Sequence, residues 1–106
     1  MPIITLTTDL GNTDHYVSAV KANILRQLES VNIIDISHNI PTFNVLHAAF
    51  VLKNVYKDFP PGSIHIIGVN AESNEKIPHI AVYADEHFFI GTDNGLFSLL
   101  LDIKPD

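Results

Sequence analysis

The sequence predicts an α/β fold: a three-layer αβα, Rossmann-like domain with a mainly parallel sheet. Up to Val69, β-branched segments alternate with segments of helical periodicity, and the connections between them are short. Parallel strands joined in this way need a crossover that covers the sheet, usually a helix. The chain has 106 residues and is 46% hydrophobic, which is enough for the core of one domain.

The first expected strand is Ile3–Thr8, a β-branched run that stops at the turn sequence DLGN. A helix is expected next, because apolar residues recur at helical spacing over Val17–Leu28. Thr13 or Asp14 offers an N-cap for this helix. The second expected strand is Val31–Ser37, which completes one strand-helix-strand unit.

The same unit is repeated in the next part of the chain. Pro41 suits a turn or a first helical position, because its φ is fixed and it lacks an N–H. Helical spacing returns over Val45–Tyr56, and the sequence DFPPG ends it. The third expected strand is Ser63–Val69, so a second helical crossover would precede it.

The last third of the chain has a different pattern. His79–Ala84 and His87–Gly91 are too close together to enclose a helix, so we expect a hairpin around Asp85 and Glu86. The tail that follows is strongly apolar, and no partner element follows it in sequence. We therefore expect residues 1–106 to form an incomplete N-terminal α/β domain.

Charge and composition exclude several classes of function. The net charge is −6 and the few Lys and Arg residues are scattered, so nucleic acid is not an expected ligand. Without cysteine or a long apolar run, we expect a cytoplasmic protein with no signal peptide or membrane span. We expect no metal site either, because most histidines lack metal-ligand spacing and fit surface or half-buried positions: His15, His47, His65, His79 and His87.

Several polar residues follow the expected strands at their carboxyl ends, where parallel sheets bind ligands. Asp9 follows the first strand, and a carboxylate there can accept hydrogen bonds from both hydroxyls of a ribose. Asp14 can either cap the helix or receive a cation such as an ammonium. His38 ends the second strand at the same edge. Phe43 can lie against a sugar or a base, or pack as the hydrophobic staple of the second helix.

Four sequence blocks follow one another along nearly the whole chain: TTDLGNTDHYVSAVKANIL, VNIIDISHNIPTFNVLHAAFVL, FPPGSIHIIGV and IGTDNGLFSLL. Together they resemble the S-adenosylmethionine (SAM) hydroxide adenosyltransferases, the hydrolase relatives of the fluorinating and chlorinating enzymes. The resemblance implies the N-terminal domain of an enzyme that hydrolyses SAM to adenosine and L-methionine. It also implies a homotrimer and a C-terminal β domain that this chain lacks.

The resemblance also implies roles for individual residues. Asp9 matches the aspartate that binds the ribose diol, and Asp14 matches the acidic residue near the methionine ammonium. Phe43 stands where the halogenating relatives place an aromatic ring beside the ribose, and Ser73 stands in a segment of their nucleophile pocket. No cofactor is implied, because the positive sulfonium of SAM already activates the carbon that is attacked.

The segment after the third expected strand departs from the family pattern. Hydrolases of the family usually carry an Asp-Pro-Gly-Val-Gly run followed by paired arginines. The aspartate and one arginine act with a downstream histidine to orient water. Here Asn70 replaces the aspartate, and Ile77 and Pro78 occupy the arginine positions. Asn70 is therefore the candidate at the catalytic position, although an amide holds water without acting as a base.

Three functions other than SAM hydrolysis have to be weighed. The loss of the acid and the arginines, with Asp9 retained, favours a non-catalytic protein that binds SAM or adenosine. A SAM-dependent halogenase is a further alternative, since halide selectivity depends on details of the pocket that the sequence does not expose. A calcium-dependent nucleoside hydrolase is disfavoured, because Thr7 stands where the first aspartate of its metal cluster would be.

Overall fold

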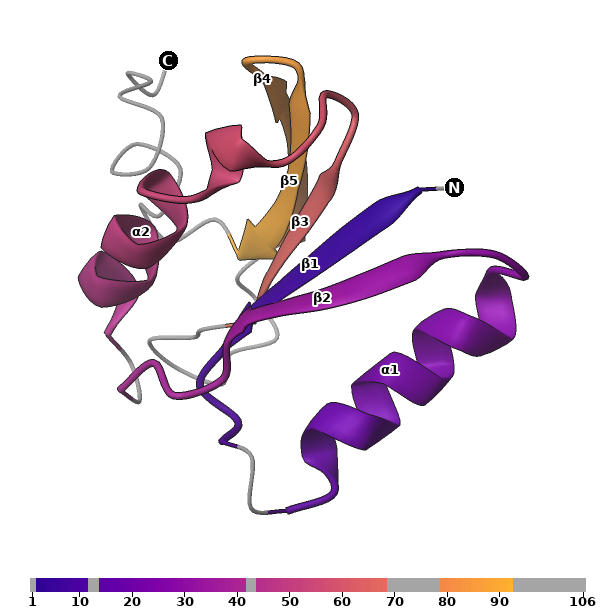
Figure 1. The fold of residues 1–106 in the computed structure, drawn as a ribbon. Helices are drawn as coiled ribbons and strands as arrows, with labels where there is room; N and C mark the ends of the chain where they lie inside the picture. Colours follow the sequence, from indigo (N-terminus) through magenta and orange to yellow (C-terminus); the bar gives the residue numbers. More distant parts are fainter. Residues whose placement is uncertain (1, 12–13, 42–43, 69–78, 93–106) are drawn as a thin grey trace.

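The computed structural model describes residues 2–11, 14–41, 44–68 and 79–92 (Figure 1). Its elements follow the expected order along the chain. They are β1 (Ile3–Thr8), α1 (Tyr16–Gln27), β2 (Asn32–Ser37), α2 (Val45–Lys53), the 3-10 helix η1 (Tyr56–Asp58), β3 (Ile64–Gly68), β4 (His79–Ala84) and β5 (His87–Thr92).

The strands form one five-stranded sheet in the order β2-β1-β3-β5-β4. β1 pairs in parallel with both β2 and β3, and β3 pairs in parallel with β5. Figure 1 shows α1 and α2 on opposite sides of this sheet. The prediction of a three-layer α/β fold with a mainly parallel sheet is confirmed.

The expected hairpin is confirmed as the antiparallel pair of β4 and β5. Its turn consists of Asp85 and Glu86, with φ values of 53° and 67°. Positive φ at both central residues is the geometry of the tight turns that best fit the twist of a hairpin. β5 continues the parallel sheet, so β4 lies at the edge.

The two helices begin in different ways. The N-cap of α1 is His15, and no side chain caps the helix there. The expected cap at Asp14 is therefore wrong, and Asp14 lies exposed one position earlier, while Thr13 falls outside the described residues. α2 has a side-chain cap, because Oδ1 of Asn44 accepts a hydrogen bond from the N–H of His47 at 2.9 Å.

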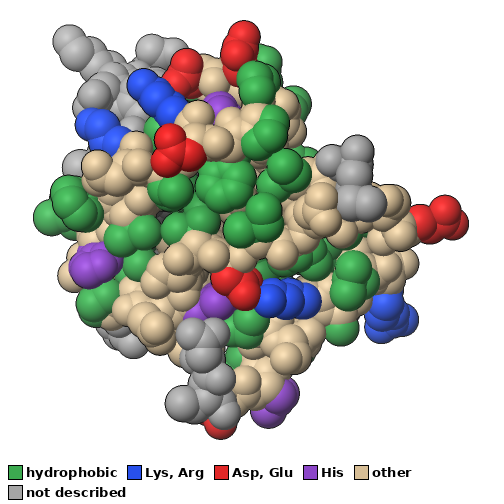
Figure 2. All heavy atoms as spheres, in the orientation of Figure 1, with side chains coloured by type: hydrophobic (Ala, Val, Ile, Leu, Met, Phe, Trp, Pro, Cys, Tyr) green, Lys and Arg blue, Asp and Glu red, His purple; other side chains and the backbone are tan. Residues whose placement is uncertain are grey.

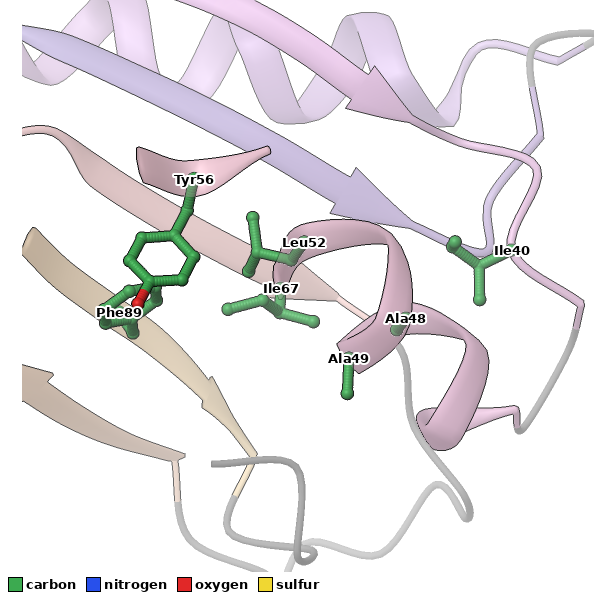
Figure 3. Close-up of a cluster of buried hydrophobic side chains, with 7 residues drawn as sticks. All are labelled: Ile40, Ala48, Ala49, Leu52, Tyr56, Ile67 and Phe89. Atoms are coloured by element: carbon green, nitrogen blue, oxygen red, sulfur yellow. The ribbon is translucent and has the colours of Figure 1, made fainter. Parts of the chain in front are cut away.

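The main hydrophobic cluster lies between α2 and the sheet (Figure 3). α2 contributes side chains one turn apart, Ala48 and Leu52, which are fully buried. Phe89 of β5 is also fully buried and packs edge-on against Tyr56 of η1. The full cluster consists of Ile40, Ala48, Ala49, Leu52, Tyr56, Ile67 and Phe89.

Some hydrophobic side chains remain exposed, including Leu46 and Phe50 on α2 and Tyr83 on β4. Figure 2 shows hydrophobic side chains over α2 and across the middle of the displayed face. None of the helices in the described ranges is long and apolar enough to cross a membrane.

Two histidines of the sheet are buried in this core. His65 of β3 and His87 of β5 are 1% and 4% exposed. Nδ1 of His65 lies 2.6 Å from Oγ1 of Thr5, and its Nε2 lies 3.1 Å from Nδ1 of His87. Both have hydrogen-bond partners, but they are buried more completely than the surface or half-buried positions that the sequence predicted.

Candidate functional site

The candidate site lies at the carboxyl ends of β1 and β2, which are adjacent because the two strands pair in parallel. Asp9 follows β1 directly and is partly buried, and His38 follows β2 directly and is buried. Asp14 is exposed just before α1. The other residues proposed from the sequence lie outside the described part of the chain: Phe43, Asn70 and Ser73.

A row of side chains, here called the His38 chain, connects α1 to the end of β1. Nζ of Lys21 donates to Oδ2 of Asp35 at 2.7 Å. The other carboxylate oxygen, Oδ1, lies 2.8 Å from Nε2 of His38. Nδ1 of His38 lies 2.6 Å from Oγ1 of Thr8. The chain therefore consists of Lys21, Asp35, His38 and Thr8.

The carboxylate of Asp35 sets the direction of every hydrogen bond in the His38 chain. Burial opposes the ionisation of Asp35, but hydrogen bonds from Lys21 and His38 outweigh it and lower the pKa of this carboxyl. An ionised carboxylate only accepts, so Nε2 of His38 carries a hydrogen. In the neutral ring, Nδ1 is then the acceptor, and the hydroxyl of Thr8 donates to it.

The hydroxyl of Thr8 also holds the backbone around Asp9. Its oxygen accepts a hydrogen bond from the N–H of Leu10 at 3.2 Å. A hydroxyl that accepts from the N–H two residues later closes a small turn, and Asp9 is the central residue of that turn. The orientation of Asp9 is thus coupled to the hydroxyl that His38 fixes.

The main chain of His38 holds the same loop a second time. The N–H of Gly11 donates to the carbonyl of His38 at 2.7 Å, and the N–H of Ile40 donates to the carbonyl of Thr8 at 3.3 Å. Gly11 has a φ of +76°, a conformation that favours glycine. The loop from Asp9 to Gly11 is therefore fastened to the end of β2 on both sides.

This arrangement has a definite chemical capacity. Asp9 presents a carboxylate on a fastened loop, suited to accept hydrogen bonds from neighbouring hydroxyls of a ligand. No group of three or more His, Asp or Glu side chains within the described ranges could hold a metal ion. A separate hollow lined by Asp85 and Glu86 lies at the turn of the hairpin, at the opposite end of the sheet.

The sequence alone did not show Thr8, Lys21 or Asp35 as part of the site. One signal was present: Asp35 stands between Ile34 and Ile36 in the strand NIIDIS, and a charged residue among the apolar residues of a strand usually has a partner. The sequence also predicts that His38 lies at the carboxyl end of the second strand, and the structure confirms that it follows β2 directly.

Comparisons with known proteins place the whole chain beside one group of enzymes. The family model described as the SAM hydroxide adenosyltransferase N-terminal domain matches residues 4–106. The (R)-S-adenosyl-L-methionine hydrolase of Methanocaldococcus jannaschii is 38% identical over 107 residues, covering 96% of this chain and 40% of that protein. A fluorinase of Actinopolyspora mzabensis is 30% identical over 63 residues, covering 59% of this chain and 21% of that protein.

A solved structure has a similar fold. An uncharacterized conserved protein from Thermotoga maritima superposes with a TM-score of 0.85 and 32% sequence identity, covering 93% of this chain and 38% of that one. The chain thus spans less than half the length of the relatives that it matches.

Proposed function

Because the chain belongs to the SAM hydroxide adenosyltransferase family, we propose that it binds SAM at the carboxyl ends of β1 and β2 as part of a SAM hydrolase. The observation that carries this proposal is the position of Asp9, partly buried at the end of β1 on a loop fastened to β2. A carboxylate in this position is suited to both hydroxyls of the ribose of SAM.

In the proposed reaction, the oxygen of water attacks the ribose carbon that is bonded to the sulfonium. The carbon–oxygen bond forms as the carbon–sulfur bond breaks, and the sulfur keeps the electron pair and leaves as the neutral thioether of L-methionine. The attacking water loses one proton to the solvent, which gives adenosine. The protein then has to align the water with the breaking bond, and no cofactor or metal takes part.

Other parts of the site are proposed from the family resemblance. Asp14 would face the ammonium of the methionine part, which its exposed position before α1 permits. Phe43 and Ser73 would line the ribose and nucleophile region, and Asn70 would hold the water. A homotrimeric assembly and a cytoplasmic location remain predictions.

A second candidate function is binding of SAM or adenosine without turnover. It is favoured by the sequence after β3, where Asn70, Ile77 and Pro78 replace the acid and the arginines of the hydrolases. Transfer of the adenosyl group of SAM to a halide ion is a third candidate function, supported by the partial similarity to a fluorinase.

One experiment separates these candidates. The protein encoded by the complete reading frame is incubated with SAM, and adenosine, methionine and 5′-halogenated adenosine are measured by chromatography with and without chloride, fluoride and a chelator. We expect adenosine and methionine to form in equal amounts, at a rate that halide and chelator do not change. In Asp9→Asn we expect this rate to fall at least about tenfold. Tight binding without product, measured by calorimetry, would instead identify a binding protein. The absence of both binding and product would refute the proposal.

A further inference from the structure

We propose that His38 is a positioning residue, which holds Asp9 in the orientation that receives the ribose of an adenosyl ligand. It acts through the hydroxyl of Thr8 and through its own carbonyl. The inference rests on the proposed function, because the ligand of Asp9 is taken from there. His38 itself is not placed in contact with the ligand.

The first support is that the inner part of the His38 chain is buried and fully paired. His38 is 3% exposed and Thr8 is 4% exposed. Polar groups in such positions are unfavourable unless they have hydrogen-bond partners, and both ring nitrogens of His38 have one. The outer members are partly exposed, with Lys21 and Asp35 side chains at 33% and 40%. The chain therefore runs from the surface beside α1 to the buried end of β1.

The second support is the way in which this chain controls the turn at Asp9. Asp35 places the hydrogen of His38 on Nε2, which leaves Nδ1 to accept from Thr8. Because the hydrogen of Thr8 is used in that bond, its oxygen is free to accept from the N–H of Leu10. Removing the ring of His38 takes away the acceptor for the hydroxyl that closes the turn.

The third support comes from the neighbouring threonine. Oγ1 of Thr7 is buried and has no hydrogen-bond partner within the described part of the chain. Oγ1 of Thr8, by contrast, makes two hydrogen bonds that converge on the Asp9 turn. Burial at this end of β1 therefore does not by itself give a hydroxyl a hydrogen bond to His38. Thr7 supplies a matched control for Thr8.

The test uses the protein encoded by the complete reading frame and calorimetric titration with SAM and with adenosine. Thr8→Val removes the hydroxyl at nearly constant shape, and we expect it to weaken binding about tenfold. Thr8→Ser restores the hydroxyl and should bind within about twofold of the wild type. Thr7→Val should leave binding unchanged. Equal affinity of wild type and Thr8→Val would overturn the inference.

A double-mutant cycle distinguishes positioning from general stabilisation. If His38 acts through Asp9, His38→Gln weakens SAM binding in the wild-type background but causes no further loss when Asp9→Asn is already present. Full additivity of the two losses would show that His38 acts by another route. Thr8→Val replaces His38→Gln in the cycle if the latter does not fold.

Amide hydrogen exchange without ligand keeps this inference separate from the proposed function. In Thr8→Val we expect exchange at Leu10 and Gly11 to accelerate about tenfold, while the amides of β3 keep their protection. Unchanged exchange at both residues overturns the positioning role alone. Accelerated exchange in a protein that binds no SAM or adenosine overturns the proposed function and the ligand part of this inference.

Discussion

Nε2 of His65 lies 3.1 Å from Nδ1 of His87, and both imidazoles are buried in the core between α2 and the sheet. Only one hydrogen fits between these two nitrogens, so the contact does not suit two protonated rings. Burial, and secondarily the charge of His87, lower the pKa of His65 from 6.5 to about 4. The unfolded chain therefore binds a proton at pH values where the folded protein does not.

This difference predicts a loss of stability in mild acid. The contribution of His65 is complete above pH 6.5 and disappears as the pH falls toward 4, so the free energy of unfolding should drop by roughly 3 kcal/mol over this window. Urea unfolding at a series of pH values measures it. We expect His65→Gln to flatten the slope, and the exposed His47→Gln to keep it. Asp35, whose pKa is lowered below 3.8, loses its contribution only at still lower pH.

The cap of α2 predicts a second stability difference. Asn44→Ala removes the acceptor for the N–H of His47, and we expect the free energy of unfolding to fall by about 1 kcal/mol. Asn44→Asp keeps an oxygen at this position and should retain the stability of the wild type. Denaturant unfolding of the three proteins is the measurement, and equal midpoints for all three would contradict the cap.

The adjacent threonines at the end of β1 predict opposite effects of the same substitution. Thr8→Val leaves Nδ1 of His38 and the N–H of Leu10 without their partner, and should lower the free energy of unfolding by about 1 to 3 kcal/mol. Thr7→Val removes a hydroxyl that no described residue bonds, and should leave stability unchanged or raise it. Thermal unfolding of both variants would refute this interpretation if Thr7→Val were the more damaging.

The hairpin turn predicts a stabilising substitution. Glu86 has a φ of 67°, where a side chain is unfavourable, so Glu86→Gly should raise the free energy of unfolding by about 1 kcal/mol. Asp85 is left unchanged, because it accepts a hydrogen bond from the hydroxyl of Tyr56. Glu29→Gly, at an exposed position without positive φ, serves as the control and should not be stabilising. Chemical denaturation of both variants tests the difference.

Much of the fold follows from local patterns in the sequence. The bounds of β1 match the β-branched run Ile3–Thr8, and the turn of the hairpin falls at Asp85 and Glu86 as expected. Each of these features depends on neighbouring residues only. The start of α1 was misplaced, because a residue suited to capping lies close to the helix without taking the cap position.

The site was less predictable, because its contacts join distant positions. Thr8 and His38 are 30 positions apart in the chain. Lys21 contacts Asp35 from α1, and the sequence does not determine beside which strand this helix packs. The burial of His65 has the same origin, because it depends on which side chains of α2 and η1 cover that face of the sheet. Asp9 and His38 could be placed at the ligand edge because that placement needs only the order of strands.

The strand order has a consequence for the synthesis of the protein. β1 leaves the ribosome before β2 and β3, yet it lies between them in the finished sheet. Its contact with β3 joins positions as far apart as Thr5 and His65, which are separated by 60 positions. A nascent chain that has emerged only as far as β2 therefore carries β1 with one edge unpaired, and closing that edge requires the slow loop closure of a long-range parallel pair.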